Sequence, residues 1–319
     1  MLTVTAAAPG KLVLAGDYVV LLGAPALVLA VNRYALVALR EEALGGWSIK
    51  SNVTSPANYA SLDELLTSDQ HDLITRILRQ LPNLTQLPVH ASLQLDSRTF
   101  YTPQGKLGLG SSAAILVAFA ELIAHLTQNQ LSDSDLIDVH NALQQNNGSG
   151  LDVLAARKGG LTRFQQRTAK HTALPSGVFM RFLFTGHSTR TAAMITKFHA
   201  LRNTYPARKM NDWLDAATHT ANAVSSKAAF FESMHELTRC ALDFDDATDL
   251  GIYSEPHRLA LKQAQRAKVI YKPCGAGGGD TGVVLSDDPA KLGFFEQNIT
   301  KHGLEMLNLE MSSHGAIIQ

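Results

Sequence analysis

A glycine-rich stretch at residues 105–113 reads Gly-Lys-Leu-Gly-Leu-Gly-Ser-Ser-Ala, and the small and apolar residues that follow predict a helix over residues 111–127. The free N–H groups and the positive dipole end of a helix N-terminus bind phosphate. Glycines let the backbone come close to the anion, and the hydroxyls of Ser111 and Ser112 could add donors or a metal ligand. We interpret this first glycine loop as a phosphate site. The alternative is a plain helix start after a loop.

The common dinucleotide-binding fingerprint does not account for this loop. Gly108, Gly110 and Ala113 match its loose spacing. That motif should directly follow a strand, and an acidic residue that binds the ribose should occur about 20 residues later. Here residue 130 is glutamine. The sequence also has no GxxxxGK[ST] motif. We therefore expect a nucleotide site that is not of the Rossmann type.

A second glycine loop, residues 273–280, reads Pro-Cys-Gly-Ala-Gly-Gly-Gly-Asp. A tight hairpin needs one or two glycines, and further glycines cost conformational entropy on folding. Four glycines in five positions therefore predict the close approach of a ligand or of another segment. A purely structural loop is the alternative.

Two shorter motifs place a charged residue next to glycines. Lys11 follows Pro9-Gly10 and precedes Gly16-Asp17-Tyr18, which by itself could be a turn with a solvated lysine. Asp152 follows Gly148-Ser149-Gly150, and an aspartate in a first helical turn can simply complement the helix dipole. Each motif remains ambiguous when it is considered alone.

Hydroxyl and cationic groups also gather after a predicted strand at residues 178–184. Residues 188–191 (Ser-Thr-Arg-Thr) begin the next predicted helix, where they would suit a phosphate or carboxylate of a substrate. The alternative is a helix cap with a surface arginine. We interpret His140 and His187 as structural histidines rather than catalytic ones, and we expect the acidic run of Asp243, Asp245, Asp246 and Asp249 to be a solvated loop.

The spacing of apolar residues predicts the elements that carry these motifs. Strands are expected over residues 2–8, 12–15, 26–39, 89–95, 178–184, 269–271 and 282–285. Helices are expected over residues 69–81, 111–127, 133–144 (with Ser132 as N-cap), 151–158, 191–203, 207–224, 227–242 and 255–267.

The composition is that of an ordinary globular protein. The 319 residues are 45% hydrophobic and 18% charged. The 28 basic and 28 acidic residues cancel, so there is no global field for nucleic acid or an anionic membrane. The two cysteines cannot form a disulfide framework, and we expect reduced thiols in a cytoplasmic protein. The apolar stretch at residues 19–31 is shorter than the about 20 residues of a membrane span, and we expect no targeting signal.

Taken together and in order, the motifs resemble those of the GHMP kinases. The resemblance rests on residues 9–18, on residues 109–114 and on residues 275–280, which span nearly the whole chain. Within this superfamily, Ala30-Val31-Asn32-Arg33-Tyr34, Gly148-Ser149-Gly150-x-Asp152, Thr185-Gly186 with Ser188-Thr189, and Lys272-Pro273 before the second glycine loop resemble the phosphomevalonate kinases.

This resemblance implies an α+β fold of two domains. The N-terminal domain, residues 1–173, would bind ATP, and the C-terminal domain, residues 174–319, would be ferredoxin-like. ATP phosphates would lie on the first glycine loop, and Ser112 would be the side-chain ligand of Mg²⁺. The implied nucleotide-binding residues are Lys106, Gly108, Leu109, Gly110, Ser111, Ser112 and Ala113.

The resemblance also implies a small-molecule acceptor, 5-phosphomevalonate, in a monomer or homodimer. Lys11 would hold the acceptor oxygen and the transferred phosphoryl group, and Asp152 would orient the acceptor or accept a proton. A phosphate monoester is largely ionised at pH 7, so we expect Lys11 to matter more than Asp152. The implied substrate-binding residues are Lys11, Asp17, Tyr18, Ser149, Gly150, Ser188, Thr189, Arg190, Gly277, Gly278 and Asp280.

Three positions depart from the patterns of related kinases. Asp17 stands where the first motif usually has glutamate, Asn146 where phosphomevalonate kinases often have lysine, and Asn141 where mevalonate kinases have an acidic metal ligand. The alternatives left open are a mevalonate kinase, another GHMP small-molecule kinase or decarboxylase, a non-catalytic ligand-binding member and, outside the family, a dehydrogenase.

Overall fold

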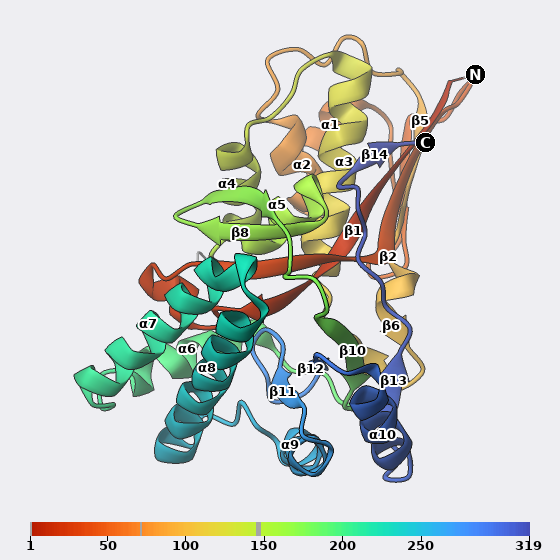
Figure 1. The fold of residues 1–319 in the computed structure, drawn as a ribbon. Helices are drawn as coiled ribbons and strands as arrows, with labels where there is room; N and C mark the ends of the chain where they lie inside the picture. Colours follow the sequence, from red (N-terminus) through yellow and green to blue (C-terminus); the bar gives the residue numbers. More distant parts are fainter. Residues whose placement is uncertain (1, 71, 145–147) are drawn as a thin grey trace.

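The computed structural model describes residues 2–70, 72–144 and 148–319, so Asn146 lies outside the described residues. Two β-sheets organise this part of the chain (Figure 1). The larger sheet has the order β14-β1-β2-β5-β3-β4, and a β8–β9 hairpin pairs with the first half of β2. Its strands are β1 (Thr3–Ala15), β2 (Ala26–Glu41), β3 (Trp47–Ser51), β4 (Ala57–Tyr59), β5 (Ala91–Asp96), β8 (Leu161–Gln165), β9 (Thr168–Thr172) and β14 (Ile317–Ile318).

Helices pack against this sheet and form its core. The central helix, α3 (Ser111–Thr127), is buried along most of its length and contacts β1, β2 and α5. Ser132 caps α4 through a capping box with Asp135, as the sequence predicts. The other helices here are α1 (Leu62–Thr67), α2 (Asp72–Leu78), α4 (Asp133–Leu143) and α5 (Leu151–Lys158). The short elements are η1 (Val19–Leu22), η2 (Arg98–Phe100), β6 (Tyr101–Thr102) and β7 (Gly105–Lys106).

The smaller sheet is antiparallel, with the order β11-β12-β10-β13. Helices α6 to α9 connect β10 to β11, and α10 connects β12 to β13, which is the β-α-β-β-α-β pattern of a ferredoxin-like fold. The strands are β10 (Phe179–Phe184), β11 (Ile270–Pro273), β12 (Thr281–Ser286) and β13 (Glu305–Leu307). The helices are α6 (Thr191–Leu201), α7 (Ala207–Asn222), η3 (Ala223–Ser225), α8 (Lys227–Thr248), α9 (Glu255–Ala267) and α10 (Pro289–Thr300).

Aromatic packing joins the segment after β1 to the C-terminal helices. The Tyr18 ring lies 4.9 Å from Phe198 and 6.4 Å from Trp213, measured between centroids. Phe244 of α8 contacts the same cluster, 5.5 Å from Phe198 and 5.2 Å from Trp213. This buried cluster holds α6, α7 and α8 against the segment that carries Asp17 and Tyr18.

The α+β class and the ferredoxin-like arrangement are confirmed, and most predicted elements exist. The boundary at residues 173/174 falls between β9 and β10 and remains a prediction, because β14 returns to the larger sheet beside β1. The strands predicted over residues 2–8 and 12–15 form one strand, β1. The elements that were not predicted include β3, β4, β8, β9, β13, β14, α1 and α10. In the described part of the chain, no helix is both long and apolar enough to cross a membrane.

The expectation of a solvated acidic loop is wrong. Helix α8 continues to Thr248, beyond the predicted end at residue 242, and includes Asp243, Asp245 and Asp246. Asp245 is 2% exposed. Periodicity missed the last turns because charged residues interrupt the apolar pattern there. Both cysteines are free and buried, in agreement with the expectation of reduced thiols.

Candidate active site

A pocket lies where the two glycine loops, the segment after β1 and the starts of α5 and α6 meet. The empty space between these segments, about 1080 Å³, includes a part that is open to solvent. The predicted site residues that line it are Lys11, Asp17, Tyr18, Lys106, Gly108, Gly110, Ser112, Ala113, Ser149, Gly150, Asp152, Thr189 and Asp280.

The first glycine loop adopts a backbone that favours glycine. Gly108 and Gly110 have φ of +73° and +78°, and Gly110 is the N-cap of α3. Ser112 in the first turn is exposed and lines the pocket, whereas Ser111 is buried and faces a second cavity. The open N-terminus of α3 is therefore presented to the pocket together with one hydroxyl, as a phosphate site requires.

Lys11 is held beside this loop by the backbone. Its N–H donates to the carbonyl of Leu109 at 2.8 Å. A Cβ at Gly10 would lie 2.8 Å from Phe100 and 2.9 Å from the Leu109 carbonyl oxygen, so glycine allows β1 to approach the loop. The Lys11 ammonium lies 3.6 Å from the Asp152 carboxylate, and these side chains are 11% and 28% exposed. The pair thus reaches the pocket at the phosphate loop.

Asp152 is positioned by a tight turn before α5. Gly150 has φ of +87°, and a Cβ there would lie 2.6 Å from Ile137 of α4. This close contact sets α5 so that Asp152, in its first turn, faces Lys11. His140 also lines the pocket, and burial lowers its pKa, with Asp152 opposing this shift and Lys11 adding to it. Burial thus favours the neutral imidazole, and the structural role expected for His140 stays a prediction.

Asp17 and Tyr18 hold the second glycine loop. Asp17 forms an ion pair with Lys272 at 2.6 Å and accepts a 2.6 Å hydrogen bond from the Gly275 N–H. The Tyr18 hydroxyl donates to the Ala276 carbonyl at 2.5 Å, and burial, with Asp17 and Asp245 nearby, raises the pKa of Tyr18 far above its usual value. Both residues line the pocket, but their polar atoms are used to hold this loop.

The sequence did not single out Lys272 as the partner of Asp17. Its ammonium also donates to the carbonyls of Val13 and Pro273, at 3.2 and 2.7 Å. Burial alone would lower the pKa of Lys272, but Asp17 and Cys274 raise it, so the side chain stays charged. The sequence did contain one signal for this pair, because a lysine within an apolar strand needs a buried acidic partner.

Asp280 closes the second glycine loop against the first. A Cβ on Gly108 would lie 2.6 Å from the Asp280 Cγ. The Asp280 carboxylate accepts a 3.4 Å hydrogen bond from the Thr189 N–H. Burial raises the pKa of Asp280 to about 6, against the opposing effects of the Thr189 N–H, Lys11 and Lys106. One carboxylate therefore lies within the phosphate-binding region.

The cluster before α6 is only partly in the pocket. Thr189 and Thr191 line it, whereas Ser188 and Arg190 are exposed and are not among its lining residues in the described chain. Gly275 and Ala276 line the pocket, whereas the predicted residues Gly277 and Gly278 are not among its lining residues in the described chain. In the described residues, the N–H groups of Ala276 and Gly277 have no hydrogen-bond partner in the protein. Because Ala276 lines the pocket, its N–H remains available to an anion there.

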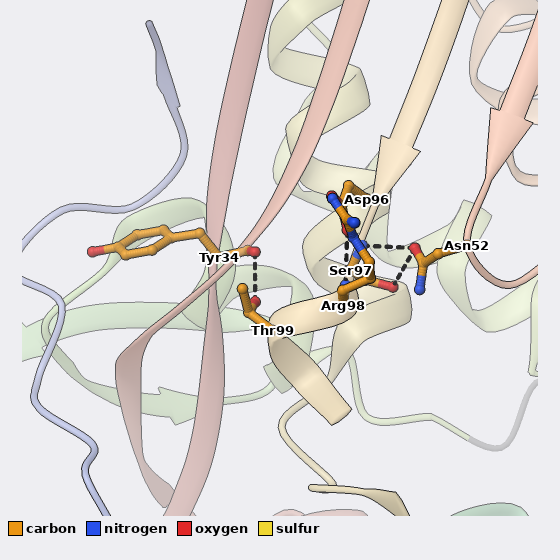
Figure 2. A network of polar contacts seen from close by, with 6 residues as sticks. All are labelled: Tyr34, Asn52, Asp96, Ser97, Arg98 and Thr99. Carbon is orange, nitrogen blue, oxygen red and sulfur yellow. Dashed lines mark hydrogen bonds and ion pairs between the residues drawn. The ribbon is translucent and has the colours of Figure 1, made fainter. Parts of the chain in front are cut away.

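A second cavity adjoins the pocket on the other side of the first glycine loop. Lys106 and Ser112 line both. Its far wall includes Ser51, Val53 and Ser97. Figure 2 shows how this wall is held: Asn52 Oδ1 accepts from the Ser97 N–H at 2.8 Å. Arg98 pairs with Asp96, and Thr99 donates to the Tyr34 carbonyl at 2.8 Å.

The donor set fits a magnesium ion that is held mainly by phosphate oxygens. Among the described residues, no group of three or more His, Cys, Asp or Glu side chains could hold a metal ion. Mg²⁺ usually keeps waters and takes few protein ligands when phosphates are present. The exposed Ser112 hydroxyl, at the helix start and in the pocket, suits that arrangement.

Comparisons with known proteins agree with this geometry. Residues 72–160 match the family model described as GHMP kinases N terminal domain. A phosphomevalonate kinase of Streptomyces sp. (strain CL190) is 26% identical, over 90% of this chain and 91% of that protein. A mevalonate kinase of Archaeoglobus fulgidus is also 26% identical, over 86% of this chain and 89% of that protein.

The fold agrees over the whole chain as well. The solved structure of Streptococcus pneumoniae phosphomevalonate kinase in complex with phosphomevalonate and AMPPNP has a TM-score of 0.76 to this protein at 19% identity. The match covers 98% of this chain and 100% of that one. The family match includes the first glycine loop and Asp152, and the fold match includes the second glycine loop. Residues 72–160 therefore resemble the N-terminal domain of the GHMP kinases, and the chain as a whole has the fold of the Streptococcus pneumoniae enzyme.

Proposed function

We propose that this protein is a GHMP kinase that transfers the γ-phosphoryl group of ATP to 5-phosphomevalonate and forms 5-diphosphomevalonate. The observation that carries the proposal is the position of Lys11, which lies between the first glycine loop and Asp152 in one pocket. The name of the Streptomyces relative and the ligands named for the Streptococcus pneumoniae structure support this acceptor and an ATP-like nucleotide.

The two cavities divide the nucleotide and the acceptor between them. Because Lys106 and Ser112 line both cavities, phosphates on the α3 N-terminus would lie at their junction. The nucleoside would extend into the cavity walled by Ser51, Val53 and Ser97. The acceptor would occupy the pocket that contains Lys11, Asp152 and Ala276.

In the transfer step, the bond between the γ-phosphorus and the β–γ bridging oxygen breaks, and a bond from the acceptor phosphate oxygen forms. Such a reaction depends mainly on positioning and on charge stabilisation. Lys11 would hold the acceptor oxygen and stabilise the transferred group, and Asp152 would orient the acceptor. Mg²⁺, when bound at Ser112 and the phosphates, would neutralise charge on the β- and γ-oxygens.

The acceptor side carries groups that suit anions. Ala276, with its free N–H group, and Thr189 and Thr191, with their hydroxyls, line this pocket. Backbone N–H groups in a loop of this kind bind phosphate or carboxylate. These groups support an acceptor with more than one anionic group.

Mevalonate is the second candidate acceptor. The Lys11–Asp152 pair could also serve an alcohol, which needs a base, and the Archaeoglobus fulgidus relative is named a mevalonate kinase. Each charged hydrogen bond left unmade costs about 1.5–3 kcal/mol. If two or three are lost with mevalonate, the expected preference for 5-phosphomevalonate is at least roughly 10²–10⁴-fold.

Measurement of kcat/KM for mevalonate and 5-phosphomevalonate with purified protein tests the proposal, using coupled ADP release as the signal. Homoserine and galactose serve as controls for other kinase acceptors. Equal or reversed preference would refute the phosphomevalonate assignment. ATP with Mg²⁺ should also raise the melting temperature by mass action, and no shift at millimolar nucleotide would refute ATP binding itself.

A further inference from the structure

Asp245 lies outside the pocket but at the centre of a buried network. It belongs to the last turns of α8, and its carboxylate accepts hydrogen bonds from the N–H groups of Gly251, Ile252 and Tyr253 at 2.7, 2.7 and 2.8 Å. The Arg258 guanidinium lies 3.5 Å from its Oδ2. A carboxylate near a helix C-terminus is opposed by the dipole, and burial adds a desolvation cost. The three N–H donors and Arg258 offset these costs.

The segment that Asp245 binds lies directly beneath the second glycine loop. The Ile252 carbonyl accepts a 2.8 Å hydrogen bond from the Gly278 N–H. A Cβ at Gly277 would lie 2.5 Å from that carbonyl oxygen, and a Cβ at Gly278 would lie 3.2 Å from the Gly251 carbonyl oxygen. The glycines therefore let the loop rest on residues 251–253 at a distance that no side chain permits.

His257 supports the same loop from α9. It is fully buried, with Nε2 2.8 Å from the Gly279 carbonyl oxygen and Nδ1 2.6 Å from the Tyr271 hydroxyl. A carbonyl can only accept, so Nε2 carries the proton and Nδ1 accepts from Tyr271. Asp245, through Ile252, and His257 thus support two neighbouring residues of the second glycine loop, Gly278 and Gly279.

We infer that Asp245 is a positioning residue for the acceptor side of the active site. The chain of contacts runs from its carboxylate through Ile252 to Gly278, and along the second glycine loop to Ala276, which lines the pocket. Nucleotide phosphates would instead lie at the N-terminus of α3, and the hydrogen bonds of this network do not include α3. The identity of the acceptor in this inference rests on the proposed function. The role of Asp245 in ordering the second glycine loop does not depend on it.

Substitution of Asp245 in the full-length protein gives a graded test. Oδ1 accepts from Gly251 and Ile252, and Oδ2 accepts from Tyr253. Asp245→Asn can keep the two bonds to Oδ1 but places an amide N–H against the Tyr253 N–H, and Asp245→Ala loses all three bonds. Asp243→Asn is the matched control, because it removes one charge from the same helix at an exposed pair with Arg239.

We expect Asp245→Asn to raise the acceptor KM or lower kcat so that kcat/KM for the acceptor falls about tenfold or more, as for misplacement of a binding group. The dissociation constant of AMPPNP should change less than about twofold, and Asp243→Asn should behave as wild type. Amide hydrogen exchange at residues 275–280 should accelerate in Asp245→Asn while exchange in α3 is unchanged.

The exchange measurement separates this inference from the proposed function. If the wild-type protein phosphorylates neither acceptor, the proposed function fails, and the exchange of residues 275–280 still tests the positioning role. If Asp245→Asn only lowers the melting temperature, with wild-type acceptor kinetics and wild-type exchange at residues 275–280, the inference is wrong. Should Asp245→Ala fail to fold, Asp245→Asn alone decides.

Discussion

Lys11 and Asp152 face each other at 3.6 Å over the backbone of Gly110. A Cβ built on Gly110 would lie 3.2 Å from Lys11 Cε and 3.6 Å from Asp152 Oδ2. The second half of β1, the first glycine loop and the start of α5 therefore meet at one point. A phosphoryl group on the α3 N-terminus would be within reach of both charged side chains there.

The two charged residues should differ in their importance. We expect Lys11→Ala to lower kcat by about 10²–10³-fold, because its charge acts on the transferred group in the transition state. Asp152→Asn should cost about tenfold or less with 5-phosphomevalonate, since an ionised phosphate oxygen needs little help from a base. Steady-state kinetics on both variants measures this difference.

Lys158→Ala is the control for the loss of a lysine, because Lys158 pairs with Asp133 at the other end of α5. It should leave kcat unchanged. An Asp152→Asn defect as large as that of Lys11→Ala would indicate an acceptor that must lose a proton, which is the behaviour of an alcohol.

Gly110→Val should abolish nucleotide binding without unfolding the protein. The φ of +78° at Gly110 strains any residue with a Cβ by roughly 1–2 kcal/mol, and the new side chain would also meet Lys11. Gly105→Val is the matched control: it has φ of +144° in the same loop, but no heavy atom lies within 4 Å of its Cβ position.

Circular dichroism should show a native fold for both variants, and AMPPNP titration should show binding only for Gly105→Val. Normal nucleotide affinity in Gly110→Val would mean that the first glycine loop is not the phosphate site.

The sequence predicted those features that depend on local pattern. The helix over Ser111–Thr127 and the cap at Ser132 are confirmed, because apolar periodicity and capping chemistry act within a few residues. The resemblance to the GHMP kinases also implied a common site for Lys11 and Asp152, and both residues line one pocket.

Contacts between distant segments could not be predicted in this way. Asp245 is part of an acidic run that is typical of a solvated surface, and only the fold brings Gly251, Ile252 and Tyr253 to its carboxylate. Asp17 likewise forms its ion pair with Lys272, which lies near the other end of the chain. Such pairs depend on topology, which residue spacing does not specify.

Asp280 should make stability depend on pH in an unusual direction. Its folded pKa of about 6 lies above the ordinary value of 3.8, so the folded state holds this proton more tightly than the unfolded state does. The free energy of unfolding contributed by this group is therefore greatest below about pH 4 and falls as the pH rises through 6. The loss is at most ~3 kcal/mol.

Asp280→Asn keeps an oxygen for the Thr189 N–H and removes the charge. The variant should melt a few degrees above wild type at pH 7.5, and the difference should vanish near pH 4. Asp287→Asn, at an exposed pair with Lys291, should show no such trend. A constant difference between Asp280→Asn and wild type across this pH range would contradict the assignment.

The Lys272–Asp17 ion pair should stabilise the second glycine loop. The two side chains are 5% and 12% exposed, and Asp17 also binds the Gly275 N–H. Lys272→Met leaves the Asp17 charge buried without its cation, which typically costs about 3–5 kcal/mol. We expect a large fall in the unfolding free energy and, because Gly275 moves with Asp17, a weaker interaction with the acceptor.

The double variant Lys272→Met/Asp17→Asn removes the unpaired charge while an amide oxygen can still accept from Gly275. It should therefore recover part of the lost stability, as measured by urea denaturation. If the double variant is as unstable as the sum of the two single variants, the two side chains do not act as a pair and the ion pair is not what holds the loop.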